Sequence, residues 1–166
     1  SLPIFAAMVL ASKADITSNM ALWRAQIVAS KKAHPFASRV LPGQVTPQTL
    51  IEAMKKHMTG DTYVVTDVGQ HQMWAAQFCD IEKPRHFITS GGLGTMGYGL
   101  PAAMGAQCGN PDSQVVCISG DGGIMMNGQG FATVARCGFN VKTIVMHNSV
   151  LGMVNQWQRM FYGQHY

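Results

Sequence analysis

The stretch Val115-Val116-Cys117-Ile118-Ser119-Gly120-Asp121-Gly122-Gly123 decides the fold class. Its first five residues carry no charge and are rich in β-branched side chains, which is typical of a strand that is buried on both faces. A glycine-rich turn follows, and the apolar spacing after it predicts a helix over Ile124–Arg136. A buried strand that passes through a tight turn into a helix is the repeating unit of a parallel α/β sheet.

The same pattern recurs on both sides of this stretch. Further strands are predicted at Tyr63–Thr66, His86–Thr89 and Val141–Met146, and further helices at Gln70–Cys79, around Gly99–Cys108 and at Leu151–Tyr162. Upstream, Thr46 as an N-cap before Pro47 predicts a helix that ends near Gly60. Apolar residues at helical spacing predict one more helix within Ser18–Lys32. The predicted fold class is α/β, a parallel sheet with helices on both faces.

The domain organisation follows from a change in composition. The segment Ala33–Gln44 contains Pro35, Pro42 and Gly43 and is typical of a linker. We therefore expect residues 1–44 to be an N-terminal segment and linker helix from a preceding domain. Residues 45–166 are expected to form the sheet domain, truncated at its C-terminus.

The composition indicates a surface that is covered by another chain or domain. Charged residues make up 12% of the 166 residues, and hydrophobic residues 47%. A soluble domain usually has about 25% charged residues. Between His86 and Ala135 there is no Lys or Arg, and the acids are Asp112 and Asp121. These features argue against disorder and against a free monomer, and they favour an oligomer.

Three other classes of protein are disfavoured. The basic residues behind the net charge of +4 stand singly or in pairs on predicted helices, which does not favour a nucleic-acid-binding surface. The apolar run Leu2–Ala11 is too short to span a bilayer and lacks the positive leader of a signal peptide. Cys79, Cys108, Cys117 and Cys137 form no C-x-x-C pair and lie in apolar contexts, so we expect buried thiols without zinc or disulfides.

Polar residues gather where the predicted strands end. In a parallel sheet, ligands bind beyond the carboxyl ends of the strands. Four loops occupy that edge: Asp67–His71, Ser90–Gly94, Gly120–Gly123 and His147–Ser149. We expect these four loops to converge on one site.

Asp121 and Asn148 are the candidate metal ligands. Asp121 is the only charged residue between Asp112 and Arg136, and an isolated buried carboxylate costs several kcal/mol unless it is paired or bound to a metal. Oxygen ligands from Asp and Asn suit Mg²⁺, which often shares its shell with a diphosphate, and the N-terminus of the following helix suits phosphate. The alternative is that Asp121 caps the helix and Asn148 forms a turn. Spacing does not separate the two interpretations.

A dinucleotide-binding site is a further alternative. The segment Gly92–Gly97 fits G-x-G-x-x-G between a strand and a helix, with Asp121 24 residues after its last glycine. Against this interpretation, Pro101 follows closely and the acid lies inside a second glycine-rich turn. We regard it as the weaker interpretation.

Several longer strings resemble one enzyme family. Gly120-Asp121-Gly122 with Asn148 at this interval resembles the thiamine diphosphate signature. The strings Val68–Gln77, Thr89–Ala103 and Leu151–Gln158 resemble the catalytic subunit of acetohydroxyacid synthase, also called acetolactate synthase. The resemblance runs from about Pro35 to Tyr166 and implies a fragment of the C-terminal, thiamine diphosphate-binding domain.

The resemblance implies an activity and its cofactors. The family decarboxylates pyruvate and condenses the two-carbon unit with a second 2-keto acid in branched-chain amino-acid biosynthesis, using thiamine diphosphate and Mg²⁺. The metal ligands would be Asp121, the Asn148 side chain and the Val150 carbonyl. Gln70 and His71 would contact the diphosphate, and Met96 would hold the two cofactor rings in a bent arrangement. The implied cofactor-binding residues are Val68, Gly69, Gln70, His71, Gly94, Met96, Gly120, Asp121, Gly122, Gly123 and Asn148.

Met153 and Trp157 are the candidate substrate-pocket residues. They lie one helical turn apart on one face of the last predicted helix. The resemblance implies that they line the pocket for the second 2-keto acid. The residues by themselves favour a place in the helix core.

The chain departs from the family at two places in these motifs. His147 stands where the family usually has the first of two adjacent asparagines, and we expect it to be a satisfied residue at the strand end. Gly128 and Gly130 fall inside the predicted helix Ile124–Arg136, and each should cost about 1 kcal/mol relative to alanine. A looser helix there would weaken the positioning of the diphosphate.

The family's enzymes contain domains that these 166 residues do not include, and this difference bears on activity. The family's N-terminal domain, which carries the catalytic glutamate, and its FAD-binding middle domain fall outside these residues. Glu52 and Glu82 lie outside the motif loops, so the chain alone is expected to be inactive until the N-terminal domain of the same or another chain completes the site. FAD would bind only with the middle domain. The expected compartment is the cytoplasm, or a plastid or mitochondrion in a eukaryote. The alternative is a non-catalytic remnant kept as a structural subunit of a larger complex.

Overall fold

The computed structural model describes residues 4, 8–10, 12, 20–36 and 42–166. These residues belong to two compact units, Ser1–Ala37 and Ser38–Tyr166. In the first unit, helix α3 (Ala21–Ala33) overlaps the predicted range Ser18–Lys32 and ends one residue beyond it, and its apolar residues Leu22, Trp23 and Val28 are exposed. Most of the apolar run Leu2–Ala11 lies outside the described residues. Within the described ranges, no helix has the length and apolar character that crossing a bilayer requires. The domain boundary at residue 44 stays a prediction.

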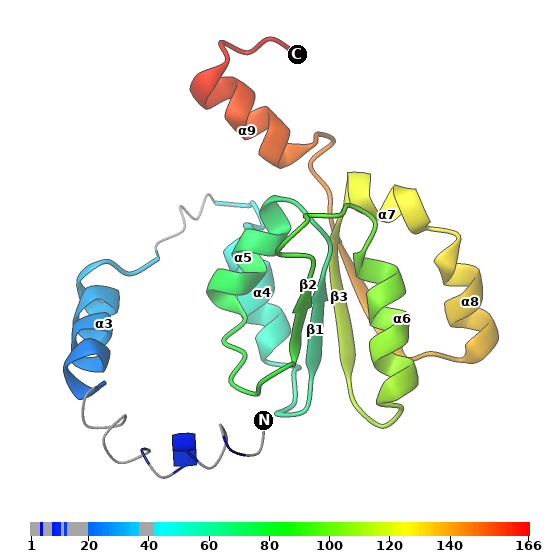
Figure 1. Ribbon diagram of the computed structural model, residues 1–166. Coiled ribbons are helices and arrows are strands. Elements are labelled where there is room, and N and C mark those ends of the chain that lie inside the picture. Colours follow the sequence, from blue (N-terminus) through cyan, green and yellow to red (C-terminus); the bar gives the residue numbers. More distant parts are fainter. Residues whose placement is uncertain (1–3, 5–7, 11, 13–19, 37–41) are drawn as a thin grey trace. The chain divides into compact units, whose positions relative to one another are not determined.

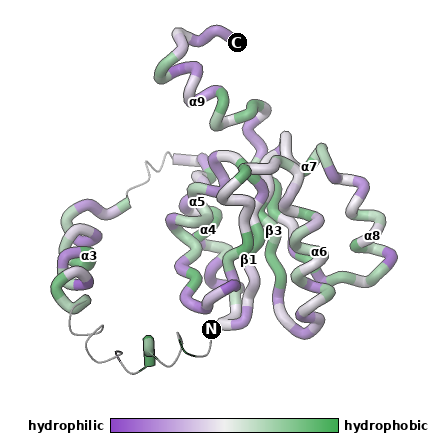
Figure 2. Tube along the Cα trace, viewed as in Figure 1, coloured by the Kyte–Doolittle hydropathy of each residue, from purple (hydrophilic) through white to green (hydrophobic). Residues whose placement is uncertain are grey.

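The second unit is built on a four-stranded parallel sheet (Figure 1). Its strands are β1 (Tyr63–Thr66), β2 (Phe87–Thr89), β3 (Val115–Gly120) and β4 (Val141–Met146), in the spatial order β2-β1-β3-β4. Val65 lies opposite Ile88 on one side and Cys117 on the other. All six residues of β3 are buried, and Figure 2 shows this strand in the hydrophobic colour. The predicted strands are confirmed to within one residue at each end.

Helices cover both faces of the sheet, as predicted. The helices after α3 are α4 (Pro47–Lys55), α5 (Gln70–Phe78), α6 (Gly99–Gly109), α7 (Asp121–Asn127), α8 (Gly130–Cys137) and α9 (Gly152–Phe161). On one face Ile51 of α4 and Ala75 of α5 pack with Val64 and Val116. On the other face Ala103 of α6 packs with Val65, Val115 and Cys117. Neighbouring residues of β1 and β3 thus enter opposite layers, which explains why these strands have no polar face.

Helix α4 begins as its sequence predicts and ends earlier. The Thr46 hydroxyl accepts from the Thr49 N–H at 3.2 Å, and the Thr49 hydroxyl accepts from the Thr46 N–H at 3.0 Å, a complete capping box. The predicted end near Gly60 is wrong, because the helix stops at Lys55. The Thr59 N–H is bound by the Thr62 hydroxyl at 2.8 Å, so the backbone there follows a turn.

The single helix predicted over Ile124–Arg136 is two helices. Helix α7 ends at Asn127, whose side chain donates to the Gly97 carbonyl at 2.7 Å, and α8 begins at Gly130. Glycine has low helix propensity, which favours a break between Gly128 and Gly130. A Cβ at Gly130 would lie 3.1 Å from Cδ2 of Leu100, so the glycine also permits close packing of α8 on α6.

The cysteines divide into two pairs, which corrects the prediction that all four are buried. Cys79 and Cys117 are buried, and burial raises the pKa of their thiols to about 11 and about 12. Cys108 and Cys137 lie in the last turns of α6 and α8 and are exposed. Cys108 and Cys137 lie in largely apolar stretches of the sequence, but each cysteine lies on a helix face that is exposed to solvent. All four are free thiols.

Candidate functional site

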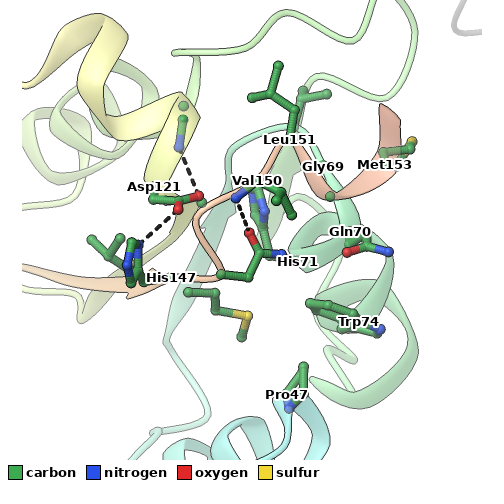
Figure 3. A pocket seen from close by; sticks show the side chains of 18 of the residues that line it. Pro47, Gly69, Gln70, His71, Trp74, Asp121, His147, Val150, Leu151 and Met153 are labelled. Carbon is green, nitrogen blue, oxygen red and sulfur yellow. Dashed lines mark hydrogen bonds and ion pairs between the residues drawn. The ribbon is translucent and has the colours of Figure 1, made fainter. Parts of the chain in front are cut away.

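A cavity of about 540 Å³ lies at the carboxyl ends of β1, β3 and β4 (Figure 3). The loops after these strands, together with the first turns of α5, α7 and α9, supply most of its lining. Pro47 and Leu50 of α4 and Trp74 of α5 complete one side. The lining includes all eleven residues predicted to bind the cofactor, together with Val150 and Met153. The structure therefore brings the predicted motif residues to one place.

Asp121 is less isolated than the sequence suggests. Its side chain is 24% exposed, so the prediction of a buried, unpaired carboxylate is wrong. Oδ1 accepts from the Gly122 N–H at 3.0 Å, and Oδ2 accepts from the Ser149 N–H at 2.8 Å. The Nδ1 atom of His147 lies 2.8 Å from the same Oδ2. Desolvation by burial raises the pKa of Asp121, but the two N–H groups and His147 outweigh it, and the net effect lowers this pKa. Asp121 is therefore ionised at neutral pH.

Asn148 lies in the loop after β4, next to the end of β3. Its Oδ1 accepts from the Val150 N–H at 3.1 Å, which is the turn that the alternative interpretation predicted. Asp121 likewise bonds to the first turn of α7 through Gly122. Both residues nevertheless line the cavity. The local turn and cap contacts are thus compatible with a ligand-binding role.

The carboxylate that is deeply buried is Asp67, at the end of β1. Asp67 is 1% exposed. Its Oδ1 accepts from the N–H groups of Val68 at 2.7 Å and Gly97 at 3.0 Å, and its Oδ2 from Gly99 at 3.0 Å. A Cβ at Gly123 would lie 2.4 Å from Oδ1, so only glycine fits there. The sequence analysis placed Asp67 in a loop at the sheet edge and missed this role, because the glycines that donate to its carboxylate lie about 30 residues further along the chain.

The same contacts contradict the dinucleotide-binding alternative. That alternative requires the N-terminus of the helix after Gly92–Gly97 to receive a diphosphate. In the structure, Gly97 and Gly99 at the start of α6 donate to the carboxylate of Asp67 instead. The protein's own anion fills this helix terminus.

The ring of His71 and the start of α5 both border the cavity. His71 is 6% exposed, and its Nε2 has no hydrogen-bond partner among the described residues. A Cβ at Gly120 would lie 3.0 Å from the ring, so glycine is required for β3 to pass the imidazole. Burial lowers the pKa of His71 against the opposing charge and backbone of Asp67, so the ring is neutral at neutral pH. The N-cap of α5, Gly69, provides no side-chain cap. The uncapped N-terminus of α5 is the feature of this corner that suits an anion.

The remaining predicted site residues, Gln70, Met153 and Trp157, differ in whether they line the cavity and in what they contact. The Gln70 Nε2 donates to Gln156 Oε1 at 2.8 Å and joins α5 to α9. Met153 lines the cavity, whereas Trp157 lies outside its lining, is 53% exposed and packs edge-on against Phe161 with ring centroids 5.7 Å apart. No residue of α9 is buried, so the helix-core interpretation of Met153 and Trp157 is wrong, while their place in a substrate pocket stays a prediction.

No group of three or more His, Cys, Asp or Glu side chains arranged to hold a metal occurs in the part of the chain that the structure describes. The candidate cation site at Asp121 differs in kind, because its other donors would be an amide oxygen and a backbone carbonyl. Such oxygen donors suit a hard cation that keeps several waters.

Comparison with known proteins gives a consistent result. Residues 67–166 match the model of the thiamine pyrophosphate enzyme, C-terminal TPP binding domain; thiamine pyrophosphate is thiamine diphosphate. The chain is 46% identical over 157 residues to the acetolactate synthase large subunit of Corynebacterium glutamicum, covering 94% of this chain and 25% of the relative. It is 56% identical over 110 residues to the acetolactate synthase of Arthrospira platensis, covering 66% and 19%. It is 45% identical over 140 residues to the chloroplastic acetolactate synthase 1 of Nicotiana tabacum, covering 84% and 21%. The chain thus spans about a quarter or less of the length of these relatives.

Proposed function

Because the chain belongs to the thiamine pyrophosphate enzymes through their C-terminal TPP-binding domain, we propose that it is the diphosphate- and Mg²⁺-binding part of an acetohydroxyacid (acetolactate) synthase. The observation that carries this proposal is the convergence of eleven motif residues on one cavity at the carboxyl ends of the strands. In open parallel sheets this edge is where ligands bind.

The cation would bind at Asp121. This carboxylate is ionised at neutral pH, and Asn148 lies in the loop after the adjacent strand β4. Asp121, the Asn148 side chain and the Val150 carbonyl would supply three oxygen ligands, and water and the diphosphate would complete the shell of Mg²⁺. The donor set therefore fits this metal.

The diphosphate would bind near the start of α5. The uncapped N-terminus of α5 at Gly69 suits a phosphate group, and His71, whose Nε2 has no partner among the described residues, would lie beside it. Gln70 would turn from Gln156 to join the same contact. Met96, which lines the cavity, would support the cofactor rings. When bound, thiamine diphosphate supplies the carbon nucleophile that attacks a 2-keto acid.

Substrates and partners follow from the relatives and from the surface. We propose that the complete enzyme decarboxylates pyruvate and transfers the two-carbon unit to a second 2-keto acid, with Met153 and Trp157 in the acceptor pocket. The N-terminal domain of the same or another chain would supply the catalytic glutamate, and the middle domain would bind FAD. The exposed residues Leu93, Leu151 and Val154, at 92%, 51% and 58%, would be covered in that oligomer. The compartment would be the cytoplasm or, in a eukaryote, a plastid or mitochondrion.

A second candidate function is a structural subunit that has lost catalysis. The observation that favours it is the helix break at Gly128–Gln129, at the end of the short helix α7 that begins at Asp121. A retained Asp121 with its donors opposes it. The two candidates differ in whether the chain binds cofactor.

The test is the thiamine diphosphate and Mg²⁺ content per chain of the protein purified with its partners attached. We expect near-stoichiometric amounts of both, and we expect Asp121→Ala to abolish Mg²⁺-dependent cofactor binding while the fold stays intact. Asp112→Ala is the matched control, because Asp112 is exposed and does not line the cavity. Absence of both cofactor and metal from a chain that remains in its complex would favour the structural subunit.

A further inference from the structure

We propose that His147 is a positioning residue that holds Asp121 and the loop after β4 in place for the cation. This inference rests on the proposed function, since it concerns the same cation site. It starts from a position at which the chain departs from the family pattern, where a histidine replaces the first of two asparagines.

The first contact fixes the carboxylate. The Nδ1 atom of His147 lies 2.8 Å from Oδ2 of Asp121, which also accepts from the Ser149 N–H at 2.8 Å. Oδ2 therefore receives two donors, while Oδ1 accepts from the Gly122 N–H alone among the described residues. Two donors on one oxygen set the rotation of the carboxylate and leave acceptor capacity on the other oxygen for a cation.

The second contact fixes the loop. The Nε2 atom of His147 lies 3.1 Å from the Ser149 hydroxyl. Ser149 has φ +61°, a left-handed conformation that is costly for a residue other than glycine. Holding Ser149 in this conformation directs its N–H to Asp121 and sets the direction of the chain at Asn148 and Val150. The imidazole thus contacts one proposed cation ligand, Asp121, and the residue that stands between the other two, Ser149.

His147 is placed to support the cation rather than to bind it. In Figure 3 His147 lies on one side of Asp121, and Val150 and His71 lie on the other. The His147 side chain is 69% exposed, so it contributes little to the core. Residues that hydrogen-bond to metal ligands change metal affinity by about 10- to 100-fold when they are replaced.

The experiment compares three replacements of His147 in the intact protein with its partners. Asn places its amide nitrogen where His147 has Nδ1, Gln extends its amide one carbon further toward the position of Nε2, and Leu has neither donor. Mg²⁺ affinity is measured by calorimetry at saturating thiamine diphosphate, and the melting temperature is measured without metal. His57→Leu is the control, because His57 is exposed and lies outside this cavity.

We expect His147→Leu and His147→Gln to weaken Mg²⁺ binding by about tenfold or more, and His147→Asn to restore most of the loss. The metal-free melting temperature of the variants should stay at the parental value. A purely structural role of His147 would instead lower it. Parental Mg²⁺ affinity in His147→Leu, or equal affinities in the Asn and Gln variants, would overturn the positioning role. A parent that binds neither cofactor nor Mg²⁺ would instead overturn the proposed function, and this inference with it.

Discussion

Asp67 and Asp121 end adjacent parallel strands, yet the two carboxylates have different environments. Asp67 follows β1 and is buried, with three backbone N–H donors from its own loop and the loop before α6. Asp121 follows β3, is partly exposed, and takes its donors from Gly122, Ser149 and His147. The first joins segments of the protein to one another, while the second faces the cavity.

The difference shows what separates a structural carboxylate from one that is available to a ligand. A buried charge must have its acceptor positions satisfied within the protein, or it costs several kcal/mol. Asp67 meets this requirement with donors that only the folded chain supplies. Asp121 lies at the cavity wall, where solvent or a cation can complete its shell. The following predictions test this contrast through the free energy of unfolding.

Replacing Asp67 should have the largest effect. Asp67→Asn puts an NH₂ group where one carboxylate oxygen accepts from Gly97 or Gly99, so at least one buried N–H loses its acceptor. We expect a loss of about 3 kcal/mol or more, because hydrogen bonds to charged groups and unsatisfied buried groups are each worth about 1–3 kcal/mol. Urea unfolding measures it. A loss as small as that of a surface substitution would show that Asp67 is not the joining residue.

Adding a methyl group next to Asp67, by the substitution Gly123→Ala, should lower the free energy of unfolding by a smaller amount. The Cβ of Gly123→Ala would lie 2.4 Å from Oδ1 of Asp67, so backbone or carboxylate must move. We expect a loss of about 1–3 kcal/mol, the usual cost of overpacking. The matched control is Gly105→Ala in α6, where a Cβ meets no atom within 4 Å. That variant should be stabilised by about 0.5–1 kcal/mol, as measured in the same urea titrations.

The pH dependence of stability should report His71, whose pKa is influenced by the charges of both aspartates. Burial lowers the pKa of His71 below the unfolded value of 6.5, so the unfolded chain binds the proton more tightly. The contribution of the neutral ring to stability is complete above about pH 6.5 and declines as the pH falls toward the folded-state pKa, by at most about 1.4 kcal/mol per pH unit. His71→Gln should remove this slope from urea titrations at several pH values. His57→Gln, at an exposed position, should keep it.

Replacing Asp121 should have the smallest effect on stability. Asp121→Ala leaves the N–H groups of Gly122 and Ser149 near solvent, so we expect a change of less than about 1 kcal/mol. Thermal unfolding of the metal-free protein measures it. A loss equal to that of Asp67→Asn would mean that the two aspartates play the same structural part.

Features that depend on local sequence could be predicted. The strands β1 and β3 could be located because both of their faces are buried, which leaves an unbroken apolar run. The start of α4 could be located because Thr46 and Pro47 act through neighbouring backbone. The cavity residues could be grouped because parallel strands deliver their following loops to one edge.

Features that depend on contacts between residues far apart in the sequence could not be predicted. Asp67 differs from Asp121 through Gly97, Gly99 and Gly123, which lie far along the chain and are recognised as its neighbours only in the fold. The exposure of Cys108 likewise depends on which face of α6 meets the sheet. His147 could be recognised as unusual, but its contact with Asp121 requires the register of β3 with β4.

The central position of β3 has a consequence for measuring ligand binding. All six residues of β3 are buried, and the strand is hydrogen-bonded to β1 on one side and β4 on the other. Its amide hydrogens should therefore exchange with solvent deuterium only when the whole domain unfolds, whereas those of the loop after β4 should exchange through local opening. The exchange rate of β3, the strand that leads to Asp121, thus provides an internal reference for global unfolding. A ligand that slows exchange in the loop more than in β3 acts on the site itself.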